Sequence, residues 1–155
     1  MLFLLFQLGR DRYALDVAQV AEVIPLVQLK ALPQAPRGVA GLCNYRGKAV
    51  PVIDLSALAL DRPARARLST RLILVRYAAP GGGDELLGLL AEQVTDTIRR
   101  EPAEFTPAGV DSPEARYLGP VTRDRAGLVQ RIEPAQLLTP EVRAVLFQTQ
   151  TEAGR

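Results

Sequence analysis

The sequence predicts an all-β protein made of two small five-stranded barrels with a few short helices. Short β-prone runs alternate with turn signals along the 155-residue chain. An apolar share of 48% is enough for a sizeable buried core. The pattern also repeats: in each half a hairpin is followed by a proline-containing connector, a second hairpin and a short helix. Because neither copy alone has much surface to bury, we expect the two copies to share an interface.

The N-terminal segment predicts a hairpin. Leu2–Leu8 and Tyr13–Val17 are β-prone runs joined by the turn signal Gly-Arg-Asp-Arg. The apolar residues of the next stretch, up to Ile24, have mixed spacing, which fits either a helical turn or a strand with a bulge. Pro33 and Pro36 then predict an extended connection, because proline restricts the residue before it to extended conformations.

The centre of the chain predicts a second hairpin. Two apolar arms, Val39–Cys43 and Ala49–Ile53, flank a polar tip of Asn-Tyr-Arg-Gly, where the glycine allows a positive φ. Arg46 therefore carries a fixed positive charge at a tight turn. Asp54 follows the second arm and is a plausible N-cap for a short helix.

The second half predicts further strands between polar connectors. Residues 61–69 form a basic, exposed connector, residues 78–85 a loop, and residues 99–116 a long irregular connection rich in proline. The strands are expected at Leu72–Tyr77, Leu86–Ala91, Tyr117–Thr122 and Gly127–Ile132, and Val94–Ile98 adds a further short apolar piece.

The C-terminal region predicts helix. Pro134–Leu138 fits one helical turn, and Pro140–Gln148 fits a terminal helix that places Val142, Val145 and Leu146 on one face. Thr149–Arg155 has no packing signal and is expected to fray. We therefore expect one domain over residues 1–148. Its first barrel would lie mainly in 15–70 and its second mainly in 71–138, with strands exchanged near the termini.

The repeat can be aligned residue by residue. Tyr13–Ile24 resembles Leu87–Ile98, and residues 41–58 resemble residues 119–137. In the second pair, each segment has a glycine, a polar turn with arginine, an apolar strand, an acid and a leucine-bearing turn. A chance likeness between short β patterns is the alternative to a true duplication.

Several chemistries are excluded by composition. The chain has no histidine, so no Ser-His or Cys-His nucleophile pair exists. Its one cysteine, Cys43, lies in an apolar arm and is expected to be a buried structural thiol. No phosphate-cradling glycine motif occurs. We predict no catalysis, no cofactor and no metal. An enzyme using Asp54, Glu92 or Asp96 would need those carboxylates to converge in one pocket.

The charge pattern gives little support for nucleic-acid binding. The net charge is +2, with 9 basic and 5 acidic residues in 1–70 against 10 and 12 in 71–155. Small barrels often bind nucleic-acid strands, so such a module is the alternative function, but its basic, aromatic face is lacking. The apolar start of the chain has no basic region or cleavage site, and no run approaches the roughly 20 apolar residues of a membrane helix. We expect a cytoplasmic protein without direct membrane insertion.

A set of longer motifs resembles a known family. The motifs are Phe6-Gln-Leu-Gly, Tyr13-Ala-Leu-Asp-Val, Val20-x-Glu-Val-Ile, Leu32-Pro-x-Ala-Pro, Gly38-Val-x-Gly-Leu-x-Asn-x-Arg-Gly-x-x-Val-Pro-Val-Ile-Asp-Leu and Gly88-Leu-Leu-x-Glu-x-Val. Together they resemble the CheW family of chemotaxis coupling proteins, and the likeness covers most of the chain.

The resemblance implies both fold and function. The fold would be two intertwined five-stranded SH3-like barrels. The function would be that of an adaptor linking the cytoplasmic tips of methyl-accepting chemoreceptors to the regulatory domain of a CheA-type histidine kinase. The groove between the barrels would receive the receptor helices, and a barrel edge would meet the kinase. The implied partner-binding residues are Glu22, Val39, Gly41, Asn44, Tyr45, Arg46 and Gly47. Glu22 and Arg46 are expected to pair, since each is an isolated charge in an apolar segment; two unpaired solvent-facing charges are the alternative.

Three departures from the family pattern stand out. Tyr45 occupies a position where leucine is usual and places a hydroxyl beside Arg46. Glu92 replaces a customary aspartate, and Gln130-Arg131 interrupts a strand that is usually more apolar, so either that edge is exposed or its partner differs. These departures fit a variant that serves a non-flagellar, surface-sensing chemosensory pathway.

Overall fold

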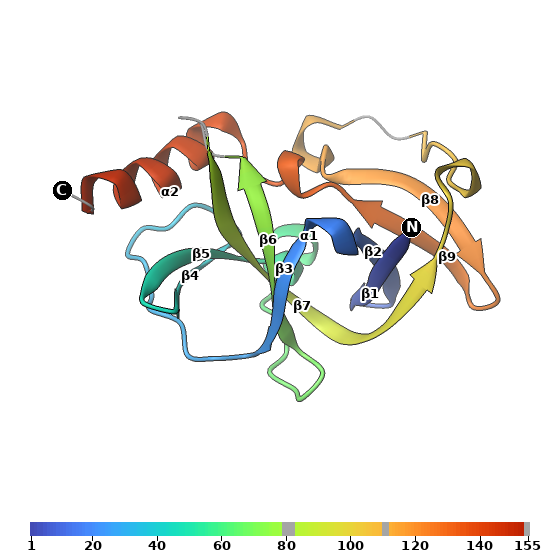
Figure 1. Ribbon diagram of the computed structural model, residues 1–155, viewed down its shortest axis with the longest axis horizontal. Helices are drawn as coiled ribbons and strands as arrows, with labels where there is room; N and C mark the ends of the chain where they lie inside the picture. The colour runs from blue at the N-terminus through green and yellow to red at the C-terminus, as the bar shows by residue number, and fades with distance from the viewer. Residues whose placement is uncertain (79–82, 110–111, 154–155) are drawn as a thin grey trace.

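The computed structural model describes residues 1–78, 83–109 and 112–153 of the chain (Figure 1). Its strands are β1 (Leu2–Leu8), β2 (Asp11–Asp16), β3 (Val20–Pro25), β4 (Val39–Tyr45), β5 (Lys48–Asp54), β6 (Arg71–Ala78), β7 (Asp84–Arg99), β8 (Leu118–Asp124) and β9 (Gly127–Ile132). The helices are α1 (Leu55–Leu60) and α2 (Pro140–Ala153). Short 3₁₀ turns are η1 (Val17–Gln19), η2 (Pro102–Glu104), η3 (Pro113–Ala115) and η4 (Pro134–Gln136).

The strands form two five-stranded groups that share one long strand. The first group has the order β4-β5-β7-β6-β3, and the second has the order β7-β1-β2-β9-β8. Figure 1 shows the first group on the left, the second on the right, and β7 passing from one to the other. In neither group do the described outer strands pair with each other, so the sheet is not closed by hydrogen bonds. The predicted all-β class with a few short helices is confirmed.

The strand pairing reproduces the repeat predicted from the sequence. In the second group β2 runs parallel to β9, with Ala14 opposite Arg131. In the first group β7 runs parallel to β5, with Gly88 opposite Val52. The sequence alignment had matched Ala14 with Gly88. Each hairpin also receives one isolated β-bridge from the connector before it, Lys30 to Leu42 in one half and Thr106 to Val121 in the other.

The predicted strand Leu86–Ala91 and the separate apolar piece Val94–Ile98 both belong to β7, which is one continuous strand of 16 residues. Gln93 lies between the two predicted pieces and has a positive φ of 52°. That conformation turns the strand without breaking it, and the register against β1 shifts at the same place, between Leu5 and Gln7. After this bend β7 leaves β5 and β6 and pairs with β1.

The sharing of β7 also decides how the chain divides. β6 and the first part of β7 pair with β3 and β5, so residues 71–91 lie with the first group and not with the second, where the sequence had placed them. The N-terminal hairpin β1–β2 completes the second group. The boundary therefore falls within β7 instead of near residue 70.

The hydrophobic core joins the two groups. Its largest cluster contains buried side chains from both groups, among them Phe6, Leu15, Ile73, Leu89 and Ile132. A smaller cluster lies within the first group and includes Cys43, Val50 and Leu72, and another lies within the second around Phe3 and Val129. Since each fully buried aliphatic or aromatic side chain contributes about 1.5–3 kcal/mol, the shared cluster couples the stability of the two halves.

The two helices have different residues at their N-termini, an aspartate cap for α1 and a proline for α2. Asp54 caps α1 as predicted: its Oδ1 accepts hydrogen bonds from the backbone of Ser56 and Ala57, at 3.0 and 3.2 Å. α2 begins at Pro140 as predicted but continues through Ala153, and residues 154–155 of the expected frayed tail lie outside the described residues. Of the predicted apolar face, Val142 packs against the core and Leu146 is buried, but Val145 is 53% exposed, so its predicted place on that face was wrong.

The residues that dock α2 are Leu146 and Phe147, which are both buried. The ring of Phe147 stacks on that of Tyr77, with centroids 5.4 Å apart. α2 therefore rests on β6, and an aromatic contact between residues 70 positions apart in sequence decides its orientation.

Candidate functional site

The β4–β5 hairpin presents Arg46 at its tip. Arg46 and Gly47 are the two turn residues, and both have positive φ angles, of 52° and 81°, as a type I′ turn requires. Asn44 supports the turn, because its Oδ1 accepts a hydrogen bond of 3.0 Å from the backbone of Gly47. The predicted tight turn is confirmed, and the Arg46 side chain is 78% exposed.

Glu22, Tyr45 and Arg46 form a polar cluster beside this tip, which we call the hairpin cluster. The Tyr45 hydroxyl donates a hydrogen bond to Oε2 of Glu22, and Nη2 of Arg46 lies 3.7 Å from the same oxygen. The Arg46 guanidinium also lies over the Tyr45 ring, 5.0 Å from its centroid. The expected Glu22–Arg46 pair is therefore present, and Tyr45 joins it.

The electrostatics of the hairpin cluster follow from these contacts. The hydrogen bond to Glu22 raises the pKa of Tyr45, because it stabilises the protonated phenol, and the nearby charge of Arg46 partly opposes this effect. Exposed ion pairs contribute little to folding stability, so stability alone gives no reason for this arrangement. It holds one cation, one anion and one ring at the surface in a defined geometry.

A local irregularity positions Glu22. The 3₁₀ turn η1 is capped by Asp16, whose Oδ1 accepts from the backbone of Ala18 at 2.9 Å. The pairing of β3 with β6 then shifts register between Val20 and Glu22. Both alternatives considered for this stretch, a helical turn and a bulged strand, therefore occur in succession.

The other predicted site residues have different environments. Asn44 and Gly47 are exposed at the tip, whereas Val39 is half-buried and Gly41 is buried. Gly41 has a φ of 147°, and a Cβ there would lie 2.4 Å from the carbonyl oxygen of Lys30. Gly41 thus allows the connector that contains Lys30 to approach β4 closely. Because Gly41 is buried, it supports the backbone of the hairpin and does not itself form part of the surface.

Sequence reasoning missed an ion pair next to the hairpin cluster. Nζ of Lys48, the first residue of β5, lies 2.9 Å from Oε2 of Glu85 near the start of β7. The two residues are far apart in sequence, and only the parallel pairing of β5 with β7 brings them together. No local motif could have indicated this contact.

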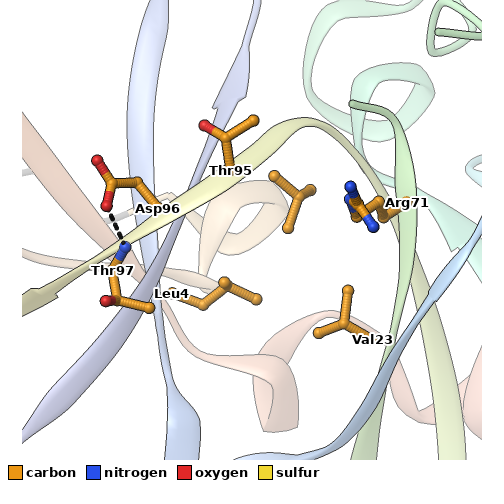
Figure 2. A pocket seen from close by; sticks show the side chains of 7 residues that line it. Leu4, Val23, Arg71, Thr95, Asp96 and Thr97 are labelled. Carbon is orange, nitrogen blue, oxygen red and sulfur yellow. Dashed lines mark hydrogen bonds between the residues drawn. The ribbon is translucent and has the colours of Figure 1, made fainter. Parts of the chain in front are cut away.

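Sequence reasoning also missed the residues of a cleft between the two groups, with a volume of about 540 Å³ (Figure 2). Val23 and Arg71 line it from the first group, and Leu4 lines it from the second. Residues 94–97 of β7 complete the lining just after the bend at Gln93. Figure 2 shows Leu4 and Val23 on opposite sides of the opening. We call this feature the inter-group cleft.

Two of the three carboxylates considered for catalysis, Asp54 and Asp96, accept hydrogen bonds from backbone groups in separate places. Asp54 is buried, and besides capping α1 it accepts a hydrogen bond of 2.9 Å from the backbone of Ala64. Asp96 is exposed and accepts from the backbone of Thr97. Within the described residues, no group of three or more Cys, Asp or Glu side chains is arranged to hold a metal ion.

Comparison with known proteins decides the family. The sequence model of the CheW-like domain matches residues 2–141. The chain belongs to the CheW-like family. Chemotaxis protein CheW of Klebsiella aerogenes is 26% identical over 106 residues, which span 68% of this chain and 61% of that relative. Protein FrzA of Myxococcus xanthus is 30% identical over 122 residues, spanning 77% of this chain and 72% of that protein.

A solved CheW-like structure shows the same fold. The scaffolding protein TtCheW from Thermoanaerobacter tengcongensis matches with a TM-score of 0.78 at 23% identity, over 94% of this chain and 92% of that one. This match confirms the expected fold of two SH3-like barrels. No helix among the described residues has both the length and the apolar character needed to cross a bilayer.

The CheW-like fold accommodates the unusual Gln130-Arg131 pair in β9. Arg131 is largely buried; it forms ion pairs with Asp16 at 3.6 Å and Glu133 at 3.1 Å, and it lies over the ring of Phe3. Gln130 donates a hydrogen bond of 3.0 Å to the carbonyl of Gly119. β9 pairs with β2 on one side and with β8 on the other, so it is not an exposed edge.

Proposed function

We propose that this CheW-like protein is a non-catalytic adaptor that couples the cytoplasmic tips of methyl-accepting chemoreceptors to the regulatory domain of a CheA-type histidine kinase. One observation carries the proposal: two chemically different surfaces, the inter-group cleft and the hairpin cluster, are built on one shared core. The chemotaxis names of its relatives agree with this role.

The inter-group cleft suits a receptor helix. Leu4, Val23 and Val94 give it apolar lining, and Thr95 and Thr97 give it an exposed polar rim. Amphipathic helices bind in this way, with apolar anchors in a groove and polar residues at its edge. The walls come from two groups fixed by one core, so the cleft is formed before binding and costs little further ordering.

The hairpin cluster suits the kinase domain. β4 lies at one edge of the first group, and within the described part of the chain it pairs only with β5 and, at one bridge, with Lys30. Its exposed tip offers Arg46 as a charged contact that Glu22 and Tyr45 hold in place. Rim charges of this kind set partner choice and orientation more than they set affinity.

The test is a three-component pull-down in which this protein is immobilised and the kinase regulatory domain and a soluble receptor-tip fragment, all from one genome, are added in solution. The wild-type protein should retain both partners. Arg46→Glu should lose the kinase domain and keep the tip, and Thr97→Trp should do the reverse because it fills the rim of the cleft. Arg125→Glu is the matched control for the first variant, since Arg125 lies in the β8–β9 turn that the repeat aligns with Arg46. Leu128→Trp, at an exposed position of β9, is the control for the second.

The pairing within the hairpin cluster gives a sharper readout. If Glu22 and Arg46 act together, adding Glu22→Arg to Arg46→Glu should restore part of the lost kinase binding. Strictly additive losses would argue against the pair. A folded wild-type protein that retains neither partner would reject the adaptor function itself.

A further inference from the structure

Arg71 is a cation placed in the lining of the inter-group cleft. It is the first residue of β6, where it pairs across the sheet with Pro25 of β3 and Ala91 of β7. Neither of these neighbours offers a side-chain hydrogen-bond acceptor. Figure 2 shows Arg71 on the same side of the cleft as Val23, facing the side formed by Leu4 and β7.

Arg71 has no partner of its own in the described part of the chain. Its Nε is buried and forms no hydrogen bond, and no ion pair joins its guanidinium to a described carboxylate. Among the described residues that line the cleft, Asp96 is the one acid, but Figure 2 shows its carboxylate directed away from Arg71 and bonded to the backbone of Thr97. A buried, unpaired donor on a cation destabilises a folded protein, so folding gives no reason for an arginine at this position.

We propose that Arg71 is the specificity-determining residue of the inter-group cleft, and that it binds a carboxylate carried by the helix that docks there. The inference rests on the proposed function, because it names the chemistry of the receptor helix. That helix would place apolar residues against Leu4 and Val23 and one Glu or Asp opposite Arg71. The planar guanidinium suits this task, since it can bind a carboxylate through two parallel hydrogen bonds.

The test uses the soluble receptor-tip fragment from the same genome and two measurements on each variant, calorimetric affinity for the tip and the melting temperature of the free protein. Arg71→Met keeps an unbranched side chain that can pack like the apolar stem of arginine. It removes the guanidinium and with it the unpaired donor. It should weaken tip binding at least about tenfold, the usual effect of losing a hydrogen bond to a charged group. It should also raise the melting temperature, because a buried unsatisfied group is gone. Arg125→Met makes the same change at an exposed turn and should alter neither quantity.

The partner carboxylate is then identified on the tip. Each Asp or Glu of the fragment is replaced in turn by Gln or Asn, and one of these variants should show the same loss of affinity as Arg71→Met. Combined with Arg71→Met, that variant should cause no further loss, because both remove one interaction.

The outcomes separate this inference from the proposed function. If Thr97→Trp abolishes tip binding but Arg71→Met does not weaken it, the inference about Arg71 is overturned and the adaptor function stands. A lower melting temperature for Arg71→Met, or fully additive losses with every tip variant, would also overturn it by assigning Arg71 a structural role. If the wild-type protein does not bind the tip, the receptor half of the proposed function fails and this inference fails with it.

Discussion

Replacing Asp124 by asparagine should destabilise the protein in a pH-dependent way. Asp124 ends β8, and both of its oxygens accept hydrogen bonds from Arg12 of β2, one of them at 2.8 Å. Only 21% of the Arg12 side chain and 23% of the Asp124 side chain are exposed, so solvent screens this pair less than a surface ion pair. The contact joins the N-terminal hairpin to the C-terminal hairpin across 112 residues of sequence.

The magnitude follows from the pKa of the carboxyl group. The hydrogen bonds from Arg12 lower the pKa of Asp124 from 3.8 to about 2. A lowered folded-state pKa means that the stabilisation is complete above the unfolded value of 3.8 and is lost as the pH falls toward 2. Each tenfold change in acid dissociation corresponds to about 1.4 kcal/mol, so the ionised Asp124 carboxylate contributes about 2 kcal/mol at neutral pH, most of it through Arg12 and the rest through the backbone of Ala126 and Gly127. For a chain of this size, losing about 2 kcal/mol of stability lowers the melting temperature by about 4–8 °C.

The assay is thermal unfolding followed by circular dichroism from pH 7 to pH 2.5. Asp124→Asn should melt about 4–8 °C below the wild type at pH 7, and the gap should narrow steadily below pH 4. Asp84→Asn is the control, because Asp84 is exposed and has no side-chain hydrogen bond or ion pair among the described residues. Its melting temperature should stay close to that of the wild type at every pH. A gap that is absent at pH 7, or that stays constant down to pH 2.5, would refute the reasoning.

Three further predictions address the hairpin and α2. Gly41→Ala should lower the melting temperature by several degrees, because the new Cβ would collide with the carbonyl of Lys30 at a positive φ; an unchanged melting curve would contradict this. The Cys43 thiol should react with a thiol reagent only after unfolding, since it is 1% exposed and desolvation raises its pKa; rapid labelling of the native protein would be inconsistent with its burial. Phe147→Ala should cost about 3–5 kcal/mol in the free energy of unfolding by denaturant, because the ring is buried against Tyr77; a cost below 1 kcal/mol would show that α2 does not dock there.

The local features were predictable because their signals lie within a few residues of each other. The turn at Arg46-Gly47, the capping by Asp54 and the burial of Cys43 depend on turn chemistry, hydrogen bonding and hydrophobicity that neighbouring residues already determine. The duplicated hairpins were predictable for the same reason, since the repeat preserves these short signals twice. The Glu22–Arg46 pair could be expected from the family resemblance and from the isolation of each charge in an apolar segment, and its third member, Tyr45, was noted as a departure from the family pattern.

The remaining features required the tertiary structure, because strand pairing brings together residues that no local rule connects. The sequence of β7 shows two apolar pieces, and only its partners on both sides make it one strand that unites the two groups. The inter-group cleft and the position of Arg71 result from that continuity, since the bend of β7 separates the walls. The sequence by itself thus determined the turns, the caps and the doubled all-β pattern. The long-range pairing of β7 decided how the two groups join and where the inter-group cleft lies, because it connects residues that no local rule brings together.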